Sequence, residues 1–401
     1  MSGDIAGWRR PFGRAGRAGE PPLELTHAMP PLFFFGTLRF RPLLATVLGR
    51  DPQPEDATLP GFRAVWAQGE AFPMLVDSSG QAAEGVLLRD VSEAELARLR
   101  FYEGAFCYDL VPVEVAGPHG PEPAQVFTPR DAPWQPGAPW SLDTWIRDWG
   151  TLTRIAAGEV MRAHGRETAQ EVAARLPIIR ARAQAHVNAA ARRRPVTASS
   201  PLTHDDVEVT RLDRPYEKFF TVEEYETRFR RFDGGWSASG ARAVFNAAEA
   251  VTVLPYDPAR DMVMLIEQLR MGPYALGDPQ PWFLEPVAGI VDAGESHEET
   301  ARRETLEEAH LTLDALHKVA GYYPSPGGIA QYLVSYVGIA DLRDERKRTG
   351  GLVSEGENIR NVLVSYDALV AMLDSGELVN APLILTVQWL MLNRDRLRAC
   401  P

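Results

Sequence analysis

Three glutamates in the C-terminal half of the chain have a spacing that can bring their carboxylates together. Glu304, Glu307 and Glu308 are three and four residues apart, so a helix would place all three on one face. Like charges at this spacing repel, and a divalent cation would offset the repulsion. Mg²⁺ takes oxygen ligands and is commonly shared among carboxylates, water and substrate phosphates. The spacing therefore predicts a metal site, in which the neighbouring Arg303 orients or neutralises one carboxylate.

The segment before these glutamates has a start signal for a helix. Ser296 is followed three residues later by Glu299, which is the pattern of a capping box. The preceding AGIVDAGE contains two glycines and indicates a tight loop. Together they predict a loop that leads into a capped helix carrying the carboxylates.

The whole stretch resembles the Nudix box, G-x5-E-x7-R-E-U-x-E-E-x-G-U, in which U is a bulky apolar residue. Thr305 stands where an apolar residue is usual, and it should only loosen the packing beneath the helix. His310 stands where the family has glycine. It should cost about 1 kcal/mol or force another exit from the helix, because glycine there serves a left-handed conformation. The residues that match are Gly289, Glu295, Arg303, Glu304, Glu307, Glu308 and Leu311.

The resemblance covers most of Val207 to Pro401 and points to the ADP-ribose pyrophosphatases, through EPVAGIVDAGE, SPGG and NAPLILTVQWL. It implies hydrolysis of ADP-ribose, or a related nucleoside diphosphate sugar, to AMP and ribose 5-phosphate with Mg²⁺ or Mn²⁺. A base on a mobile loop that closes over the substrate suits this chemistry. The resemblance assigns metal binding to Ala288, Glu304, Glu308 and Glu357, and catalysis to Glu355 as general base with Glu307 and Arg303.

The same resemblance suggests how the substrate is recognised. Arg242 and Arg270 are similar to arginines that hold the ADP-ribose, and Phe219 to an aromatic that stacks on adenine across a homodimer. Gln331 follows SPGG where these enzymes commonly carry glutamate, so another nucleoside diphosphate derivative stays open as substrate. A catalytically silent ADP-ribose sensor is the alternative from another class. The complete set of carboxylates disfavours it, because a sensor needs neither the base nor all metal ligands.

A second set of residues near the N-terminus could do different chemistry. The stretch FFFGTLRF predicts a strand that runs into a turn at Gly36, Thr37 and Leu38, whose backbone N–H groups could hold a carboxylate or an oxyanion. Glu103 lies between aromatic residues at the end of an expected helix, where its pKa should rise towards that of a useful general base. The alternative for Glu103 is a partly buried structural carboxylate.

These residues resemble the γ-glutamylcyclotransferase-like fold, a small β-barrel marked by a Y-G-T/S-L turn and a later glutamate. Phe35 replaces the usual tyrosine. The resemblance implies that Glu103 takes a proton from a γ-glutamyl α-amine, which attacks its own side-chain amide and releases 5-oxoproline, while Gly36 to Leu38 hold the substrate. Such a module can alternatively persist as a binding or scaffold domain. Fusion of the two modules resembles the tellurite-resistance-type Nudix hydrolases.

The length of 401 residues allows several domains, and composition changes along the chain suggest their limits. We predict a mobile leader over residues 1–28, the cyclotransferase-like barrel over 29–130, a helical extension and linker over 131–195, and a Nudix α/β/α sandwich over 205–401. The fold class is thus α+β or mixed α/β.

Two features of the helical extension are interpreted as structural. Trp145, Trp149 and Leu152 recur at helical spacing, which is typical of a packing face. The three arginines at 192–194 are interpreted as a solvated helix end.

Charge and cysteine content limit the partners. The net charge of −12 argues against nucleic acid or an anionic membrane as the main partner. The two cysteines, Cys107 and Cys400, form neither a disulfide framework nor a metal-ligand spacing, so a reducing cytoplasm is expected. The first 28 residues lack the apolar run of a signal peptide. A small-molecule substrate and a homodimer formed through the Nudix domain are the expected partners.

Overall fold

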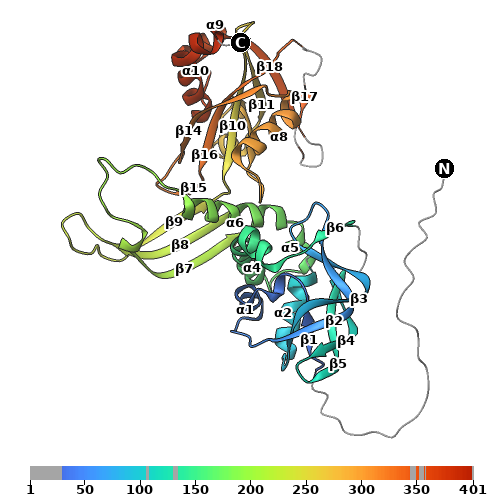
Figure 1. The fold of residues 1–401 in the computed structure, drawn as a ribbon. Helices are drawn as coiled ribbons and strands as arrows, with labels where there is room; N and C mark the ends of the chain where they lie inside the picture. The colour runs from blue at the N-terminus through green and yellow to red at the C-terminus, as the bar shows by residue number, and fades with distance from the viewer. Residues whose placement is uncertain are drawn as a thin grey trace, which may run out of the picture.

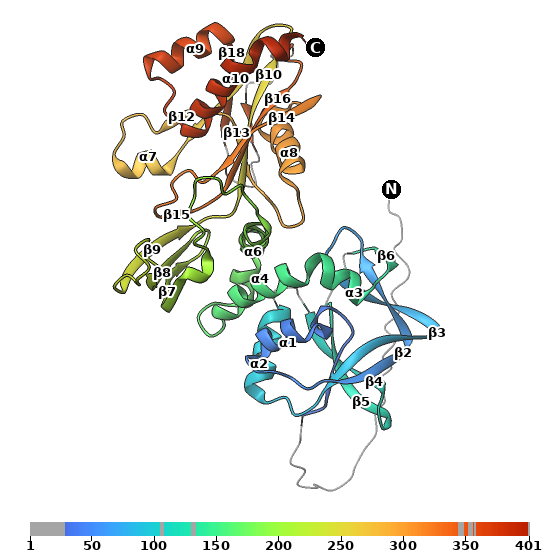
Figure 2. The same ribbon diagram turned by 60° about the vertical axis from the view of Figure 1, so that its left-hand side comes forward.

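The computed structural model describes residues 29–104, 108–129, 134–343, 349–351, 356 and 358–399. A barrel at the N-terminal end and a layered domain at the C-terminal end are separated by a group of helices (Figures 1 and 2). Within the described part of the chain, no helix is both long enough and apolar enough to cross a membrane.

The N-terminal domain is a closed barrel of five strands. Hydrogen bonding runs in the order β3-β1-β5-β4-β2, and β2 pairs with β3 to close the ring, while β6 extends from β2. This confirms the predicted small barrel. Its strands are β1 (Leu32–Phe34), β2 (Glu55–Ala67), β3 (Pro73–Leu88), β4 (Tyr108–Gly117), β5 (Gly120–Pro129) and β6 (Pro136–Pro139).

Two helices and a turn of 3-10 helix accompany the barrel. The helix α2 begins with a capping box: the Ser92 hydroxyl accepts from the Glu95 N–H at 3.3 Å, and the Glu95 carboxylate accepts from the Ser92 N–H at 2.9 Å. This reciprocal pair satisfies two donors at the helix end. The elements are η1 (Thr37–Arg39), α1 (Arg41–Leu48) and α2 (Glu93–Gly104).

The helical extension packs into the core of the barrel domain. Trp145 is fully buried, and its indole N–H donates to the Ala71 carbonyl at 2.8 Å, while Leu152 is also buried. Both belong to one apolar cluster with Leu32 and Phe34 of β1, so the prediction of a packing face is confirmed. The elements are α3 (Leu142–Trp145), the π-helical turn η2 (Ile146–Gly150), α4 (Thr151–Arg162), α5 (Ala169–Ala173) and α6 (Leu176–Ala191); we call them the connector.

One arginine after α6 is not a solvated helix end. Arg192 forms an ion pair with the buried carboxylate of Glu249, and its guanidinium lies 3.5 Å from the centre of the Tyr332 ring. The interpretation of the arginine triplet is therefore wrong for Arg192, because the Nudix domain supplies partners that local sequence cannot reveal. Arg193 and Arg194 are exposed, as expected.

A small sheet follows the linker and lies beside α6 (Figure 1). Its order is β15-β9-β8-β7, with β7, β8 and β9 antiparallel and β15 parallel to β9. The elements are η3 (His204–Asp206), β7 (Val207–Glu217), β8 (Thr221–Phe229), β9 (Gly240–Asn246) and β15 (Ile329–Ala330).

The C-terminal domain is an α/β/α sandwich, as predicted. Its mixed sheet has the order β14-β16-β10-β11-β18-β17, with β12 on β11 and β13 on β10. Every residue of β10 is buried, because helices cover both faces of the sheet. One face packs on α8 and the other on α9 and α10. The strands are β10 (Ala250–Asp257), β11 (Met262–Leu269), β12 (Trp282–Glu285), β13 (Val287–Ile290), β14 (Ala315–Tyr322), β16 (Leu333–Ile339), β17 (Thr349–Gly350) and β18 (Ile359–Ser365), and the helices are α7 (Met271–Leu276), α8 (His297–Ala309), α9 (Tyr366–Ser375) and α10 (Ala381–Ala399).

Candidate active sites

The helix α8 begins with the predicted capping box. The Ser296 hydroxyl accepts from the Glu299 N–H at 3.2 Å, and the Glu299 carboxylate accepts from the Ser296 N–H at 2.8 Å. Acidic residues in the first turn also suit the positive end of the helix dipole. The start of α8 is thus set by local sequence.

The end of α8 accommodates both departures from the box. His310 adopts the left-handed conformation with φ 56°, and its N–H donates to the Leu306 carbonyl at 3.1 Å, so the usual helix exit is kept. Its ring nitrogen Nε2 lies 3.1 Å from the Thr349 carbonyl oxygen. Thr305 is fully buried, and its hydroxyl donates to the Ala301 carbonyl at 2.7 Å. Neither departure displaces a carboxylate.

Arg303 ties the acidic residues of this site together. Its guanidinium donates to both oxygens of Glu295 at 2.9 Å, and to Glu304 and Glu307 at 2.8 and 3.2 Å. Hydrogen bonding to Glu295 is the main cause that raises the pKa of Arg303 above its usual range. The same contact lowers the pKa of Glu295. Arg303 therefore offsets the repulsion that the glutamate spacing would otherwise create.

Two of the expected metal ligands converge on the strand β13. The Glu308 carboxylate is buried and accepts from the Ala288 N–H at 3.0 Å. Glu304 lies so close to Gly289 that a Cβ there would sit 1.9 Å from the Glu304 carboxylate. Glycine at 289 is thus required by the approach of helix to strand, and the structure brings Ala288, Glu304 and Glu308 together.

The donors that converge here fit a hard divalent cation. Glu304, Glu308 and the Ala288 backbone offer oxygen ligands, which Mg²⁺ and Mn²⁺ prefer. The described ranges contain no group of three or more His, Cys, Asp or Glu side chains gathered to hold a metal by themselves. Glu355 and Glu357, expected as base and further ligand, lie outside the described residues.

The strand that precedes Glu355 in sequence packs against the end of α8. The Gly351 N–H donates to the Glu307 carbonyl at 3.2 Å, and a Cβ at Gly350 would lie 1.7 Å from the Glu308 carbonyl oxygen. The chain therefore enters the segment that carries Glu355 directly beside the carboxylate helix.

The expected recognition residues lie on other elements. Arg270 follows β11 and donates to the buried Glu285 at 2.7 Å; burial raises the pKa of Glu285 in spite of this contact. Arg242 lies exposed on β9, where its guanidinium donates to the neighbouring Ala241 carbonyl. Phe219, in the turn between β7 and β8, is 52% exposed. The structure does not itself show a nucleotide site among them.

The connector holds the turn that carries Phe219. The sequence did not predict this contact. Arg182 of α6 is 2% exposed and pairs with Glu159 of α4. It also donates to the backbone carbonyls of Phe219 and Lys218 at 2.6 and 3.2 Å. A buried arginine is recognised only through its partners, so no local pattern could have indicated this contact.

A second contact places the connector against the loop that leads into α8. A Cβ on Gly294 would lie 2.4 Å from the ring of Trp149, and Gly294 has φ 91°. The Gln184 side chain accepts from the Gly294 N–H at 3.1 Å. Ala293 packs against the apolar cluster that includes the barrel core. The loop next to Glu295 is therefore held by side chains of the connector.

The buried carboxylate of Glu249 is a further link between connector and Nudix domain. It accepts from Asn188 of α6 at 2.7 Å and lies 3.1 Å from the His297 ring nitrogen, in addition to its ion pair with Arg192. These polar partners keep the pKa of Glu249 below its usual value despite burial.

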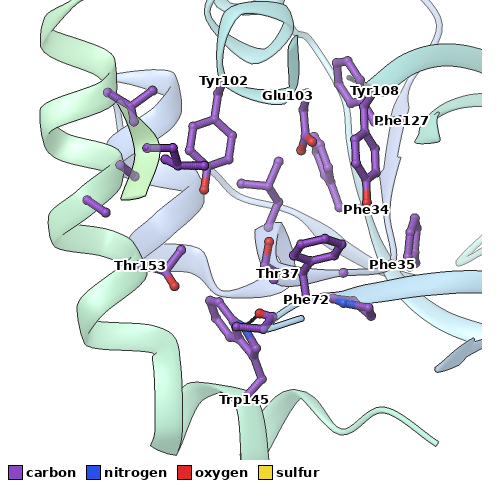
Figure 3. Close-up of a pocket in the computed structure, with 18 of the residues that line it drawn as sticks. Phe34, Phe35, Thr37, Phe72, Tyr102, Glu103, Tyr108, Phe127, Trp145 and Thr153 are labelled. Atoms are coloured by element: carbon purple, nitrogen blue, oxygen red, sulfur yellow. Dashed lines mark hydrogen bonds between the residues drawn. The ribbon is translucent and has the colours of Figure 1, made fainter. Parts of the chain in front are cut away.

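The N-terminal domain contains a pocket that encloses about 950 Å³ together with the solvent at its mouth. Gly36, Thr37 and Leu38 line it, as does Glu103 at the end of α2. Figure 3 shows the Glu103 carboxylate between the rings of Tyr102 and Tyr108, turned towards the pocket interior. The structure thus brings the predicted turn and the predicted base into one cavity.

Burial makes Glu103 a candidate proton acceptor. Removal from water raises the pKa of Glu103 to about 8, as expected for a carboxyl among aromatic rings. Phe35, which replaces the family's tyrosine, also lines the pocket and is buried. A group with such a pKa can exchange a proton near neutral pH.

The connector forms one wall of this pocket, which the sequence did not reveal. Residues of α4 and α6 line the cavity from the side opposite the barrel. They are Leu152, Thr153, Ala156, Ala157, Val160, Leu176 and Arg180. Of these, Thr153 is seen on the helix beside Thr37 in Figure 3.

Comparison with known families agrees with both sites. The model of the family described as gamma-glutamyl cyclotransferase, AIG2-like, matches residues 32–146, and the model of the NUDIX domain matches residues 247–386. The first stretch contains Glu103 and the turn from Gly36 to Leu38, and the second contains Ala288, Glu304 and Glu308.

Curated relatives resemble the C-terminal half. An ADP-ribose pyrophosphatase of Escherichia coli (strain K12) is 37% identical over 194 residues, which are 48% of this chain and 92% of that protein. An ADP-ribose pyrophosphatase of Haemophilus influenzae is 32% identical over 49% of this chain and 91% of its own length. A GDP-mannose pyrophosphatase of Yersinia enterocolitica is 31% identical over 39% of this chain and 81% of its own length.

The C-terminal fold and the acidic helix define an enzyme of the Nudix class. The chain belongs to the Nudix hydrolases, and it carries a γ-glutamyl cyclotransferase-like domain fused at its N-terminal end.

Proposed function

We propose that the C-terminal domain hydrolyses the pyrophosphate of ADP-ribose, or of a related nucleoside diphosphate sugar, to AMP and ribose 5-phosphate. The observation that carries this proposal is that Glu304, Glu308 and the Ala288 backbone lie together, with Arg303 hydrogen-bonded to Glu304. The names of the relatives from Escherichia coli and Yersinia support the substrate class.

The residues of this site would have separate roles in metal binding, proton transfer and substrate binding. A bound Mg²⁺ or Mn²⁺ would neutralise charge that develops on the phosphoryl oxygens. Glu304 and Glu308 would hold it with the Ala288 carbonyl and Glu357, while Arg303 orients Glu304 and Glu307. Glu355 would take the proton of the attacking water. Arg242, Arg270 and Phe219 would bind the substrate.

The test is AMP release from ADP-ribose with Mg²⁺, by the wild type and by Glu308→Gln. We expect the wild type to turn over, and Glu308→Gln to lose roughly 100-fold or more in rate, because a metal ligand is lost. Glu298→Gln, which changes an exposed glutamate on the same helix, is the matched control and should retain activity. ADP-ribose binding without AMP release by the wild type would favour the sensor instead.

The substrate within this class is tested by competition. Gln331 follows SPGG, and the relatives act on ADP-ribose or GDP-mannose according to their names. We propose ADP-ribose as the preferred compound. A higher kcat/KM for GDP-mannose than for ADP-ribose would reverse this assignment.

We also propose that this domain forms a homodimer. The exposed Phe219 lies in the turn between β7 and β8, beside Phe220 at 4.8 Å between ring centres. Apolar rings exposed in a cluster are typical of an interface. Sedimentation equilibrium should give twice the chain mass; a single chain at micromolar concentration would contradict the proposal.

A second function is favoured for the N-terminal domain by the environment of Glu103. We propose that it is a γ-glutamyl cyclotransferase in which Glu103 removes a proton from the substrate α-amine. The raised pKa of about 8 and the adjacent Gly36–Leu38 turn support this role. Release of 5-oxoproline from γ-glutamyl compounds tests it, with Glu103→Gln as the inactive control. Turnover that survives this substitution would refute the assignment of the base.

A further inference from the structure

The N-terminal pocket is lined by two charged side chains of opposite sign. Glu103 and Arg180 are the charged members of its lining, which otherwise consists of apolar and aromatic residues with a few hydroxyl groups. Within the described part of the chain, neither forms an ion pair with any residue. Each charge is therefore available to a ligand.

Arg180 comes from outside the stretch that resembles the cyclotransferases. It lies on α6, whereas the family match ends at residue 146. Its guanidinium lies 5.7 Å from the centre of the Trp149 ring. Glu70, Asp292 and Tyr102 are the acidic groups that lie close enough to act on its charge. None of these acidic groups pairs with Arg180, so the cation keeps free donors at the pocket.

A partly buried guanidinium without an ion-pair partner favours binding of a carboxylate. The planar fork of arginine donates two parallel hydrogen bonds to such a group. Desolvation strengthens this contact relative to the same contact in water. At the other charged residue, the Glu103 carboxylate suits a ligand amine, since a nearby positive charge favours its ionised form.

We propose that the N-terminal pocket selects γ-glutamyl compounds that carry a second, distal carboxylate, whose α-amine meets Glu103 and whose distal carboxylate meets Arg180. The preferred substrates are thus γ-glutamyl amino acids and not γ-glutamyl amines, which lack the distal carboxylate. This inference rests on the cyclotransferase function proposed above, and it makes Arg180 a specificity-determining residue supplied by the connector.

The reaction balances without a further reactant. The α-amine nitrogen forms a bond to the γ-carbonyl carbon, and the bond from that carbon to the amide nitrogen breaks. Glu103 receives the proton lost by the α-amine and passes it to the departing nitrogen. The products are 5-oxoproline and a free amino acid, whose carboxylate Arg180 holds until release.

The test compares γ-glutamylalanine with its C-terminal amide, which lacks the distal carboxylate. For the full-length wild type we expect kcat/KM for 5-oxoproline release to be about 10- to 100-fold higher with the acid, the range for a charge-assisted contact. Arg180→Met should bring this ratio close to one, and Arg180→Lys should keep part of the preference. Arg154→Met, which changes an exposed arginine of the connector, is the matched control and should keep the full ratio.

A binding experiment separates this inference from the reaction itself. Glu103→Gln should bind γ-glutamylalanine more tightly than the amide in isothermal titration, and the double variant with Arg180→Met should lose the difference. Equal binding of both compounds by Glu103→Gln, or equal kcat/KM in the wild type, would overturn the role of Arg180. Preferential binding of the acid without any 5-oxoproline release would refute the cyclotransferase function and leave the role of Arg180 intact.

Discussion

The contact between Trp149 and Gly294 predicts a measurable coupling between the connector and the Nudix loop. In Gly294→Ala the new methyl group would lie 2.4 Å from the indole, at a backbone φ of 91°. The left-handed conformation should cost about 1–2 kcal/mol for a residue with a side chain. The steric overlap should add about 1–3 kcal/mol. The total destabilisation should therefore be about 2–5 kcal/mol in the wild-type background.

Removal of the Trp149 indole should remove the steric part of this destabilisation. In a Trp149→Ala background, Gly294→Ala should cost only about 1–2 kcal/mol, because the conformational penalty remains and the overlap is gone. The coupling energy of the double-mutant cycle should be about 1–3 kcal/mol. Urea unfolding followed by circular dichroism gives the four free energies of unfolding.

Gly165→Ala is the matched control for this cycle. Gly165 also has a positive φ, of 77°, but a Cβ there would meet nothing within 4 Å. Its substitution should cost about 1–2 kcal/mol in either background. Equal costs for Gly294→Ala with and without Trp149 would refute the proposed contact.

The same variants should affect the pyrophosphatase reaction. Gly294 precedes Glu295, which holds Arg303 through two hydrogen bonds of 2.9 Å. A displaced loop would misplace Arg303 and the glutamates that it orients. We expect Gly294→Ala to lower kcat for ADP-ribose at least about tenfold, equivalent to about 1.4 kcal/mol in the barrier, with Gly165→Ala unchanged.

Three further predictions concern single residues. Burial raises the pKa of Glu103 to about 8, above its value in the unfolded chain, so the folded state binds more protons than the unfolded state between about pH 4.5 and pH 8. The free energy of unfolding should therefore fall as pH rises through this window, and Glu103→Gln should remove this fall in a pH series of urea unfolding. His310→Gly should raise the free energy of unfolding by up to about 1 kcal/mol, because glycine relieves the left-handed strain while the contact with Thr349 is lost; a loss of stability would show that this contact dominates. Arg182→Met should cost about 3–5 kcal/mol, since it leaves the largely buried Glu159 without its partner and frees the turn that carries Phe219; a change below about 1 kcal/mol in thermal or urea unfolding would contradict that role.

Local patterns were sufficient to predict the elements that position the carboxylates. The capping box at Ser296 and Glu299 indicated where α8 begins, and the spacing of Glu304 and Glu308 indicated which face they share. Both depend on contacts within a few residues, so neighbouring sequence encodes them. The barrel and the sandwich were predicted from the resemblance of each half to a known family.

Contacts between distant segments were not predictable in the same way. Trp149 was correctly assigned to a packing face, but its partner Gly294 is remote in sequence and unmarked by any pattern. Arg192 was assigned to solvent, although the tertiary fold supplies Glu249 and Tyr332 as partners. Arg270 also forms an ion pair with the buried Glu285, a partner that the sequence did not indicate. An isolated charged residue looks the same in sequence whether it faces water or a buried partner.

The sequence by itself determined the class of each domain and the chemistry of its reactive groups, because helix periodicity, capping and motif spacing act over short distances along the chain. Only the tertiary structure decided that the connector belongs to both sites: it closes the pocket of Glu103 with Arg180, and it covers Gly294 beside the carboxylate helix with Trp149. The physical reason is that burial and ion pairing are properties of surfaces that meet in the folded protein. Residues far apart along the chain acquire their roles only when packing brings those surfaces together.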